Sequence, residues 1–308
     1  MAGLRVGVCG TAHWAGTVHL PALGRADGIT LVGVQGRNVA RRELLAESFG
    51  IRPFAQFDAL LEEVDAVTLA MPPDLQPDLA LRAIAAGKHV ILEKPAARSI
   101  TDAERLKAAL RTSGTTATCF LTRRHIPETA ALIERARAAR PSTGYVTFQS
   151  VAQQADSPYA GSIWRKAPDA TLWDVGPHTL TPLVAVLGPV RTVSGERIAE
   201  GTYRLALVHV SGATSIIDIG HDAPPGQLFE HYEFGSKADG LAVTGKLYDR
   251  VAAFGRAIIE FLDAIARGQS MTPGMALGLA IVPVLVAAER AIAEGTDQTV
   301  SSANLSDI

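Results

Sequence analysis

Over residues 4–121 the sequence alternates between short apolar runs rich in β-branched residues and longer segments with helical periodicity. The runs expected to be strands are Leu4–Cys9, Thr30–Gln35, Ala66–Ala70, His89–Leu92 and Ala117–Leu121. The segments expected to be helices are Thr17–Leu23, Val39–Phe49, Asp74–Ala86 and Thr101–Leu110. Strands that alternate with helices favour βαβ units, and such units build a parallel sheet with helices on its faces. The pattern therefore predicts a doubly wound α/β domain over residues 1–122.

The pattern changes after Arg140. The strand-like runs that follow are Tyr145–Ala152, Val190–Ile198, Tyr203–Val210, Thr214–Ile219 and Leu228–Phe234. Short turns such as Ser211-Gly212 and Pro224-Pro225-Gly226 separate several of them. Such an order favours an open, mostly antiparallel sheet in a second domain, over residues 123–308. Two helices, near Val251–Ala266 and Met275–Ala293, close the chain, and periodicity alone does not decide on which domain they pack.

Helix ends carry their own signals in the first domain. Gly50 and Gly87 stand directly after helical segments, where a C-cap glycine is common. Thr101 is followed three residues later by Glu104, which matches the capping-box pattern at the start of a helix.

Composition excludes several classes of protein. The 308 residues are 47% hydrophobic and 19% charged, with a net charge of −2. This balance implies neither a disordered chain nor a basic surface for nucleic acid. Two cysteines leave no disulfide framework, and the eight histidines show no metal-ligand spacing, so no metal is expected. No apolar stretch reaches the roughly 18 residues that cross a bilayer, so we expect a cytoplasmic protein without a membrane partner.

A tight turn follows the first expected strand. Gly10, Ala12 and Ala15 fill the three small positions of a dinucleotide fingerprint, and only the first of them is glycine. Small residues there let backbone N–H groups and a helix N-terminus approach a pyrophosphate. By itself this pattern favours a nucleotide site about as much as an ordinary turn between strand and helix.

The end of the second expected strand bears on which cofactor is bound. An acidic residue about 20 positions beyond the glycines commonly holds the ribose of NAD. Here the chain has Gly36, Arg37 and Asn38, and the next acidic residue is Glu43. An arginine without a competing carboxylate suits the 2′-phosphate of NADP, so NADP is preferred over NAD. The alternative is that Arg37 is an ordinary solvated charge.

Two further segments carry groups suited to catalysis. Lys94 ends a buried strand and precedes Pro95, so its ammonium could stabilise developing charge on a substrate oxygen. A strand-end Glu93-Lys94 is also a common surface ion pair. Asp174 and His178 share one face if their segment is helical, and a carboxylate beside an imidazole suits a general base. Gly176 between them would keep that face open to a ligand. A helix-start aspartate and a partly buried histidine are the plain alternative.

Together these segments resemble the family of glucose–fructose oxidoreductase, inositol dehydrogenase and MocA (Gfo/Idh/MocA). The resemblance is carried in order along the chain by Gly10–Ala15 with His19–Leu23, Ala86–Val90 with Glu93–Pro95, Asp174–His178, and Phe254–Phe261. It implies an N-terminal Rossmann domain and a C-terminal domain whose open sheet makes oligomer contacts, as in a homodimer or homotetramer. It also implies reversible hydride transfer between a nicotinamide and a hydroxyl carbon of a sugar, cyclitol or similar small molecule.

The resemblance also assigns roles to residues. Lys94, Asp174 and His178 match its catalytic group: His178 takes the hydroxyl proton, Asp174 orients His178, and Lys94 stabilises the oxygen. The residues expected at NADP or NAD are Gly10, Thr11, Ala12, His13, Trp14, Arg37, Asn38, Met71, Pro72, Glu93, Lys94, Trp164 and Arg165. The residues expected at the substrate are Lys94, Tyr159, Asp174 and His178.

The sequence departs from the family pattern at Ala12, in place of a glycine, and at Gln76, where many members have histidine. Ahead of Asp174, the family's usual glycine run is replaced by Pro168-Asp169-Ala170-Thr171. Two other functions therefore stay open. The same fold could serve as a non-enzymatic NADP-binding sensor or co-regulator, since fold does not imply function. It could also be a lyase or glycosidase that keeps its NAD tightly bound.

Overall fold

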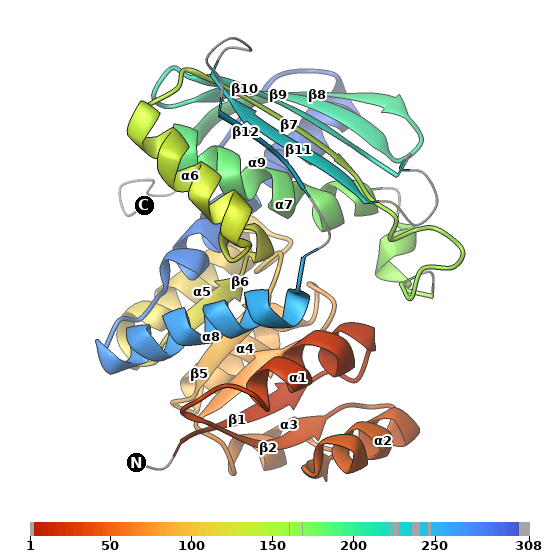
Figure 1. The fold of residues 1–308 in the computed structure, drawn as a ribbon, viewed down its shortest axis with the longest axis vertical. Helices are drawn as coiled ribbons and strands as arrows, with labels where there is room; N and C mark the ends of the chain where they lie inside the picture. Colours follow the sequence, from red (N-terminus) through yellow and green to blue (C-terminus); the bar gives the residue numbers. More distant parts are fainter. Residues whose placement is uncertain are drawn as a thin grey trace. The chain divides into compact units, whose positions relative to one another are not determined.

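The computed structural model describes residues 3–159, 161–167, 169–221, 223, 228–235, 241–245 and 248–301. The chain forms two compact units (Figure 1). The first unit contains Met1–Thr122 and Asp249–Ala276, and the second contains Arg123–Tyr248 and Leu277–Ile308. Each unit is therefore built from two separate pieces of the chain.

The first unit is built on a six-stranded sheet in the order β3-β2-β1-β4-β5-β6, in which every pair of neighbours is parallel. Its strands are β1 (Leu4–Cys9), β2 (Ile29–Gln35), β3 (Arg52–Phe54), β4 (Ala66–Leu69), β5 (His89–Glu93) and β6 (Ala117–Phe120). Strands β4 to β6 are almost entirely buried and strongly apolar, as strands covered on both faces must be. The strand order reverses between β1 and β4, which is where doubly wound sheets bind ligands. The expected parallel α/β domain is confirmed.

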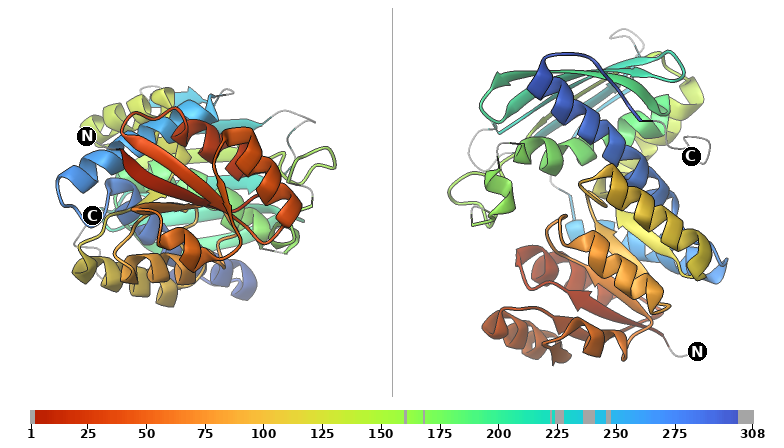
Figure 2. Two further views of the ribbon diagram at one scale, coloured as in Figure 1. Left: turned by 90° about the horizontal axis from the view of Figure 1, so that it is seen from below. Right: turned by 180° about the vertical axis from the view of Figure 1, so that it is seen from behind.

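Helices cover both faces of this sheet. They are the π-helix η1 (Ala15–His19), α1 (Leu20–Leu23), α2 (Val39–Phe49), α3 (Phe57–Leu61), α4 (Gln76–Ala85), α5 (Ile100–Ser113) and α8 (Arg250–Ala266). Helices η1, α1 and α8 pack together on one face, and α4 and α5 pack together on the other (Figures 1 and 2). The grouping of α8 with the first unit answers a question that periodicity left open.

The helix caps agree with the sequence in part. Gly50 ends α2 in the left-handed conformation, with φ of 64°, as expected of a C-cap glycine. The expected capping box at Thr101 and Glu104 was wrong. Ser99 is the N-cap of α5, and its hydroxyl oxygen accepts a hydrogen bond from the backbone N–H of Asp102 at 3.0 Å. Because the N-cap lies two residues earlier than expected, Thr101 lies inside the first turn.

The second unit is built on a seven-stranded sheet in the order β12-β11-β7-β10-β9-β8-β13. Its strands are β7 (Thr143–Gln149), β8 (Val190–Ala199), β9 (Thr202–His209), β10 (Thr214–Gly220), β11 (Phe229–Phe234), β12 (Leu241–Thr244) and β13 (Gln298–Thr299). Strands β7 and β10 are parallel, and the other neighbours are antiparallel. The expected, mostly antiparallel sheet is confirmed. The turn expected at 224–226 lies outside the described residues.

One face of this sheet is apolar and buried, and side chains alternate in burial along β7, β9, β10 and β11. Helix α7 (Ala170–Leu187) packs against β7, β9 and β10, and α6 (Pro127–Ala139) packs against α7 (Figure 1). Helix α7 continues through Pro177 and Pro182. The segment that carries Asp174 and His178 is therefore helical, as their shared face requires.

Helix α9 (Pro273–Glu294) is unusually apolar, and it continues through Pro283. Of the helices in the described part of the chain, it alone is long and apolar enough to cross a membrane. Most of its apolar window, 61%, is buried within the protein, as in the core helix of a soluble protein.

Candidate functional site

The turn after β1 depends on a glycine at its first position. Gly10 has φ of +118°, and a Cβ atom there would collide with the backbone oxygen of Ala70. The Gly10 N–H donates to the carbonyl oxygen of Gln35 at 2.9 Å, which ties the turn to the end of β2. A Cβ atom on Gly36 would in turn meet the side chain of Thr11. The backbone is thus bare and closely packed at the carboxyl ends of β1, β2 and β4, which is the kind of cradle a dinucleotide requires.

The other two small positions of the turn differ in their surroundings. Ala15 is fully buried at the start of η1, so a small residue there serves packing. Ala12 is exposed, and its carbonyl oxygen accepts from the N–H of Ala15 at 3.1 Å. His13, also exposed, lies near Arg250, and partial desolvation together with that cation lowers the pKa of His13.

Arg37 and Asn38, at the end of β2, behave differently. Asn38 is the N-cap of α2, and its side-chain oxygen accepts from the Arg41 N–H at 3.0 Å. Arg37 is exposed, and its guanidinium makes no hydrogen bond or ion pair with any residue in the described ranges. The guanidinium of Arg42, in contrast, donates hydrogen bonds to the Gly36 carbonyl oxygen and to the Glu43 carboxylate. Arg37 is thus available to an anionic group of a ligand.

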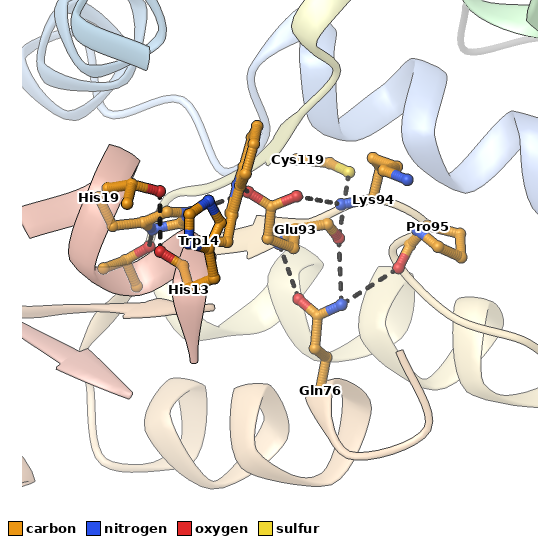
Figure 3. A network of polar contacts seen from close by, with 10 residues as sticks. His13, Trp14, His19, Gln76, Glu93, Lys94, Pro95 and Cys119 are labelled. Atoms are coloured by element: carbon orange, nitrogen blue, oxygen red, sulfur yellow. Dashed lines mark hydrogen bonds and ion pairs between the residues drawn. The ribbon is translucent and has the colours of Figure 1, made fainter. Parts of the chain in front are cut away.

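The carboxylate of Glu93 is the centre of a buried network (Figure 3). One of its oxygens, Oε1, accepts from the Trp14 indole N–H at 2.7 Å and lies 2.8 Å from Nε2 of His19. The other, Oε2, accepts from the backbone N–H of Lys94 at 3.2 Å. The opposite ring nitrogen of His19, Nδ1, lies 2.8 Å from the hydroxyl of Thr68. Glu93 is therefore a buried anchor between η1 and β5 and not a surface ion-pair partner.

Gln76 holds the backbone on either side of Lys94. Its Nε2 donates to the carbonyl oxygens of Glu93 and Pro95, at 3.2 and 3.3 Å, and its Oε1 accepts from the Glu93 N–H at 2.7 Å. Gln76 is fully buried, so these contacts satisfy three backbone groups that water does not reach. The thiol of Cys119 also donates a weak hydrogen bond to the backbone carbonyl oxygen of Glu93. Burial raises the pKa of this thiol. The Lys94 amine points away from the Glu93 carboxylate (Figure 3).

In the second unit, Arg165 brings several of the expected site residues together. Its Nε and Nη2 donate to the two carboxylate oxygens of Asp174, at 2.8 and 3.1 Å. Its guanidinium carbon lies 4.6 Å from the ring centre of Tyr159 and 4.4 Å from that of Trp164. Asp174 is buried, so this two-pronged contact holds its carboxylate in one orientation. The contact assigns Arg165 a partner that the sequence did not predict.

His178 lies on α7 with its ring stacked on that of Phe148, at 5.7 Å between centroids and 14° between planes. The expectation that Gly176 keeps this face open was wrong. Gly176 is buried, and a Cβ atom there would lie 2.7 Å from a methyl carbon of Leu285. A residue two positions from Asp174 points about 200° away on a helix, so Gly176 faces α9 instead.

Metal ligands do not gather anywhere in the described ranges, where no group of three or more His, Cys, Asp or Glu side chains could hold an ion. The other expected cofactor residues, Met71 and Pro72, follow the carboxyl end of β4, next to the Gly10 turn in the sheet order.

Comparison with known proteins identifies the family that residues 4–120 match. A family model for the oxidoreductase family Gfo/Idh/MocA, described as an NAD-binding Rossmann fold, matches residues 4–120. Residues 4–120 belong to this family. The Gfo/Idh/MocA domain thus comprises β1 to β6 and places Gly10, Glu93 and Lys94 at the carboxyl edge of its sheet.

Relatives of the Gfo/Idh/MocA domain include a dTDP-3,4-didehydro-2,6-dideoxy-α-D-glucose 3-reductase from Actinomadura kijaniata. It is 39% identical over 113 residues, which cover 36% of this chain and 34% of the reductase. The chain thus matches about a third of the length of this curated relative.

Solved structures resemble the chain over nearly its whole length. GenD2 from gentamicin A biosynthesis, in complex with NAD, has a TM-score of 0.85 and 21% identity, covering 98% of this chain and 97% of GenD2. Levoglucosan dehydrogenase, in complex with NADH, has a TM-score of 0.83 and 17% identity, covering 97% of this chain and 99% of that enzyme. These likenesses show that both units share their fold with GenD2 and levoglucosan dehydrogenase.

Three buried residues of the site were not assigned a role from the sequence: His19, Thr68 and Gln76. His19 was noted only as part of a motif, and Gln76 only as a departure from it. No local signal in the sequence pairs His19 with Glu93, because the two residues lie 74 positions apart.

Proposed function

We propose that this chain is an NAD(P)-dependent dehydrogenase or reductase that acts on a hydroxyl carbon of a sugar, a cyclitol or a related small molecule. The observation that carries the proposal is the carboxyl edge of the first sheet. There the Gly10 turn forms a bare backbone cradle, and the Glu93 network fixes the end of β5, directly before Lys94. The reductase of Actinomadura kijaniata and the levoglucosan dehydrogenase support a carbohydrate-like substrate.

The residues present fit a dinucleotide, because the turn after β1 has glycine where φ is positive and a Cβ atom would strike the Ala70 carbonyl oxygen, and small residues follow at Ala12 and Ala15. Residues Gly10–Trp14 would hold the pyrophosphate, with Met71, Pro72, Glu93, Trp164 and Arg165 as the further expected contacts. The nicotinamide supplies hydride acceptance or donation when bound. Arg37, exposed and without a protein partner in the described ranges, favours NADP over NAD because it can pair with a 2′-phosphate.

The polar side chains of the protein perform the proton transfer and stabilise the charge on the substrate. His178 takes the proton of the substrate hydroxyl on its imidazole, and Lys94 stabilises the charge that develops on that oxygen. Asp174 orients His178, and Arg165 holds the Asp174 carboxylate in turn. Tyr159, which lies against Arg165, would contact the substrate. We further propose that the protein is cytoplasmic and assembles as a homodimer or homotetramer through the second sheet.

Calorimetric titration of the cofactor-stripped protein with NADP⁺ and NAD⁺ tests the cofactor assignment. We expect tighter binding of NADP⁺, and Arg37→Ala should weaken it by about tenfold or more, since a charged hydrogen bond is lost. Arg41→Ala, which changes an exposed arginine in the first turn of α2, is the matched control and should leave the affinity unchanged. Equal loss in both variants, or preference for NAD⁺, would remove the phosphate contact from the proposal.

Turnover on a panel of hexoses, hexose phosphates and cyclitols tests the reaction. Lys94→Ala and His178→Ala should each lower turnover at least about tenfold. Lys88→Ala is the control, because Lys88 precedes β5 and bonds the Val64 carbonyl oxygen at the other end of the sheet. Full activity in either catalytic variant would refute the mechanism. Cofactor binding without turnover on any panel member would favour a nucleotide-binding sensor.

A further inference from the structure

The second unit contains a buried ion pair away from Arg165 and Asp174. Arg123 donates from Nε and Nη2 to one oxygen of Glu230, Oε2, at 3.0 and 2.7 Å. The hydroxyl of Tyr232 donates to the same oxygen at 2.8 Å. The side chains of Arg123 and Glu230 are only 3% and 2% exposed. Three polar side chains are thus fully withdrawn from water in the core of this unit.

The charge states in this network are fixed by its surroundings. Burial has the largest single effect on the pKa of Arg123 and by itself would lower it, but the surrounding groups, Glu230 first among them, together more than offset this, so the pKa is raised and Arg123 stays a cation. Burial raises the pKa of Tyr232, which therefore stays a neutral donor. A buried ion pair is often no more stabilising than an apolar pair of the same volume. Stability alone therefore does not account for a cation at this place.

The guanidinium of Arg123 lies against the ring of Phe148, and the imidazole of His178 stacks on the same ring. The guanidinium carbon of Arg123 is 4.8 Å from the ring centre of Phe148 and 5.5 Å from that of Tyr248. Phe148 lies on β7 directly opposite Glu230 on β11, so the two side chains are neighbours on the same face of the sheet. The imidazole of His178 is stacked on the same Phe148 ring, 14° from parallel. Arg123, Phe148 and His178 therefore form a continuous series of contacts.

We propose that Arg123 is a positioning residue that acts on His178 through Phe148. Glu230 and Tyr232 hold the guanidinium, the guanidinium holds the Phe148 ring through its π-face, and the ring fixes the plane of the imidazole. A general base must meet the substrate proton within a narrow range of position, and a small displacement can cost about a hundredfold in rate. The catalytic part of this inference rests on the proposed function of His178.

The outer face of the same sheet offers a matched control. There Arg204 donates to both carboxylate oxygens of Asp218, at 2.7 and 2.8 Å, and Tyr145 donates to Asp218 at 2.9 Å. The residue types repeat those of the buried network, with an aspartate in place of the glutamate. The Arg204 side chain is 52% exposed, and residues of β9 and β10 that alternate with it face the core.

The test uses the full chain with histidine labelled with ¹³C at Cε1, and the resonance of His178 is assigned by its loss in His178→Asn. Arg123→Met and Phe148→Leu should shift or broaden that resonance, and Arg204→Met and Tyr145→Phe should leave it in place. On the panel substrate with the highest turnover, Phe148→Leu should lower kcat about tenfold or more, with KM for the cofactor unchanged. In the His178→Asn background, Phe148→Leu should cause no further loss.

Tyr232→Phe serves if Arg123→Met does not fold, because it keeps both charges and removes one hydrogen bond to Glu230; it should also shift the resonance. An unchanged His178 resonance in folded Phe148→Leu and Tyr232→Phe proteins would overturn the inference while leaving the proposed function intact. So would an additive loss of kcat in the His178→Asn background. Full turnover of His178→Asn itself would instead overturn the proposed function, and the catalytic role of Arg123 with it.

Discussion

Gly10 is a residue whose backbone conformation and surroundings both exclude a side chain. Its φ of +118° is strained for any L residue, and a Cβ atom would strike the Ala70 carbonyl oxygen. We expect Gly10→Ala to lower the free energy of unfolding by more than about 2 kcal/mol and to weaken binding of both NADP⁺ and NAD⁺. Urea denaturation and calorimetric titration measure the two effects.

Gly50 provides the control for that substitution. It also has a positive φ, of 64°, but no atom lies within 4 Å of the position its Cβ would take. Gly50→Ala should therefore cost only the backbone strain, about 1 kcal/mol, and leave cofactor affinity unchanged. Equal losses of stability and affinity in the two variants would contradict the role given to the Gly10 cradle.

At single positions, the sequence indicated the chemistry of the site but not its contacts. Glu93 and Lys94 could be placed at a strand end from local pattern, because an apolar run followed by charges and proline is a local signal. The partners of Glu93 could not, since Trp14 is 79 positions away and His19 is 74. Such pairings depend on which helix packs over which strand, and hydrophobic periodicity does not specify that.

The start of α5 gives a prediction at the scale of one element. Because Ser99 and not Thr101 is the N-cap, Ser99→Ala should lower the free energy of unfolding by about 1 kcal/mol. Thr101→Ala should be nearly neutral, because Thr101 is exposed in the first turn and alanine is the better helix former. Urea denaturation of both variants compares them. A larger loss in Thr101→Ala would restore the capping box expected from the sequence.

His209 couples the stability of the second sheet to pH. Its ring lies 2.7 Å from the Gly188 carbonyl oxygen and 2.9 Å from the Ser215 hydroxyl, and burial lowers its pKa below the ordinary 6.5. The unfolded chain therefore binds a proton before the folded one as pH falls. The neutral, buried ring of His209 therefore gives its full contribution to stability above pH 6.5, and this contribution is lost as pH falls below 6.5.

Replacement of His209 by asparagine should remove this part of the pH dependence. We expect the free energies of unfolding of wild type and His209→Asn to run parallel above pH 6.5 and to converge as pH falls below it. Urea denaturation at a series of pH values measures both curves. Curves that stay parallel through the acidic range would show that His209 titrates alike in the folded and unfolded chain.

Elements with a strong periodic pattern were predictable, and short edge elements were not. The bounds of β1 and α2 agree with the sequence, because a long apolar run and a helix closed by glycine are local signals. Strand β3 was not predicted because it has only three residues, one of them Pro53, and it forms only by pairing with β2. Strand β13 has two residues and exists only through pairing with β8.

For the whole molecule, periodicity could not show that each unit takes two pieces of the chain. The second piece of the first unit joins the first piece through the packing of α8 and through hydrogen bonds at β6. In the first unit, the Ala117 N–H donates to the Ser270 carbonyl oxygen at 2.9 Å, and the hydroxyls of Thr272 and Thr118 lie 2.7 Å apart. They link residues more than 150 positions apart, which hydropathy patterns do not register.

The proposed assembly through the second sheet is a property of the whole molecule. On the sheet face opposite α7, Ile216 is 43% exposed and Phe229 is 44% exposed, and register places both on outward positions, Ile216 beside Tyr145 and Phe229 beside Gln149 of β7. A copy of the chain that packs on this face would bury both side chains. Ile216→Glu should therefore convert the homodimer or homotetramer to smaller species in sedimentation velocity, because each interface would bury an unpaired carboxylate.

Ile259→Glu is the control for that experiment. Ile259 lies on α8 in the first unit and is 61% exposed, so the same change of charge is made away from the second sheet. It should leave the sedimentation coefficient unchanged. A wild-type protein that sediments as a monomer would contradict the proposed assembly. An Ile216→Glu protein with the wild-type coefficient would place the contact elsewhere, since an interface centred on this face could not bury a carboxylate without loss of affinity.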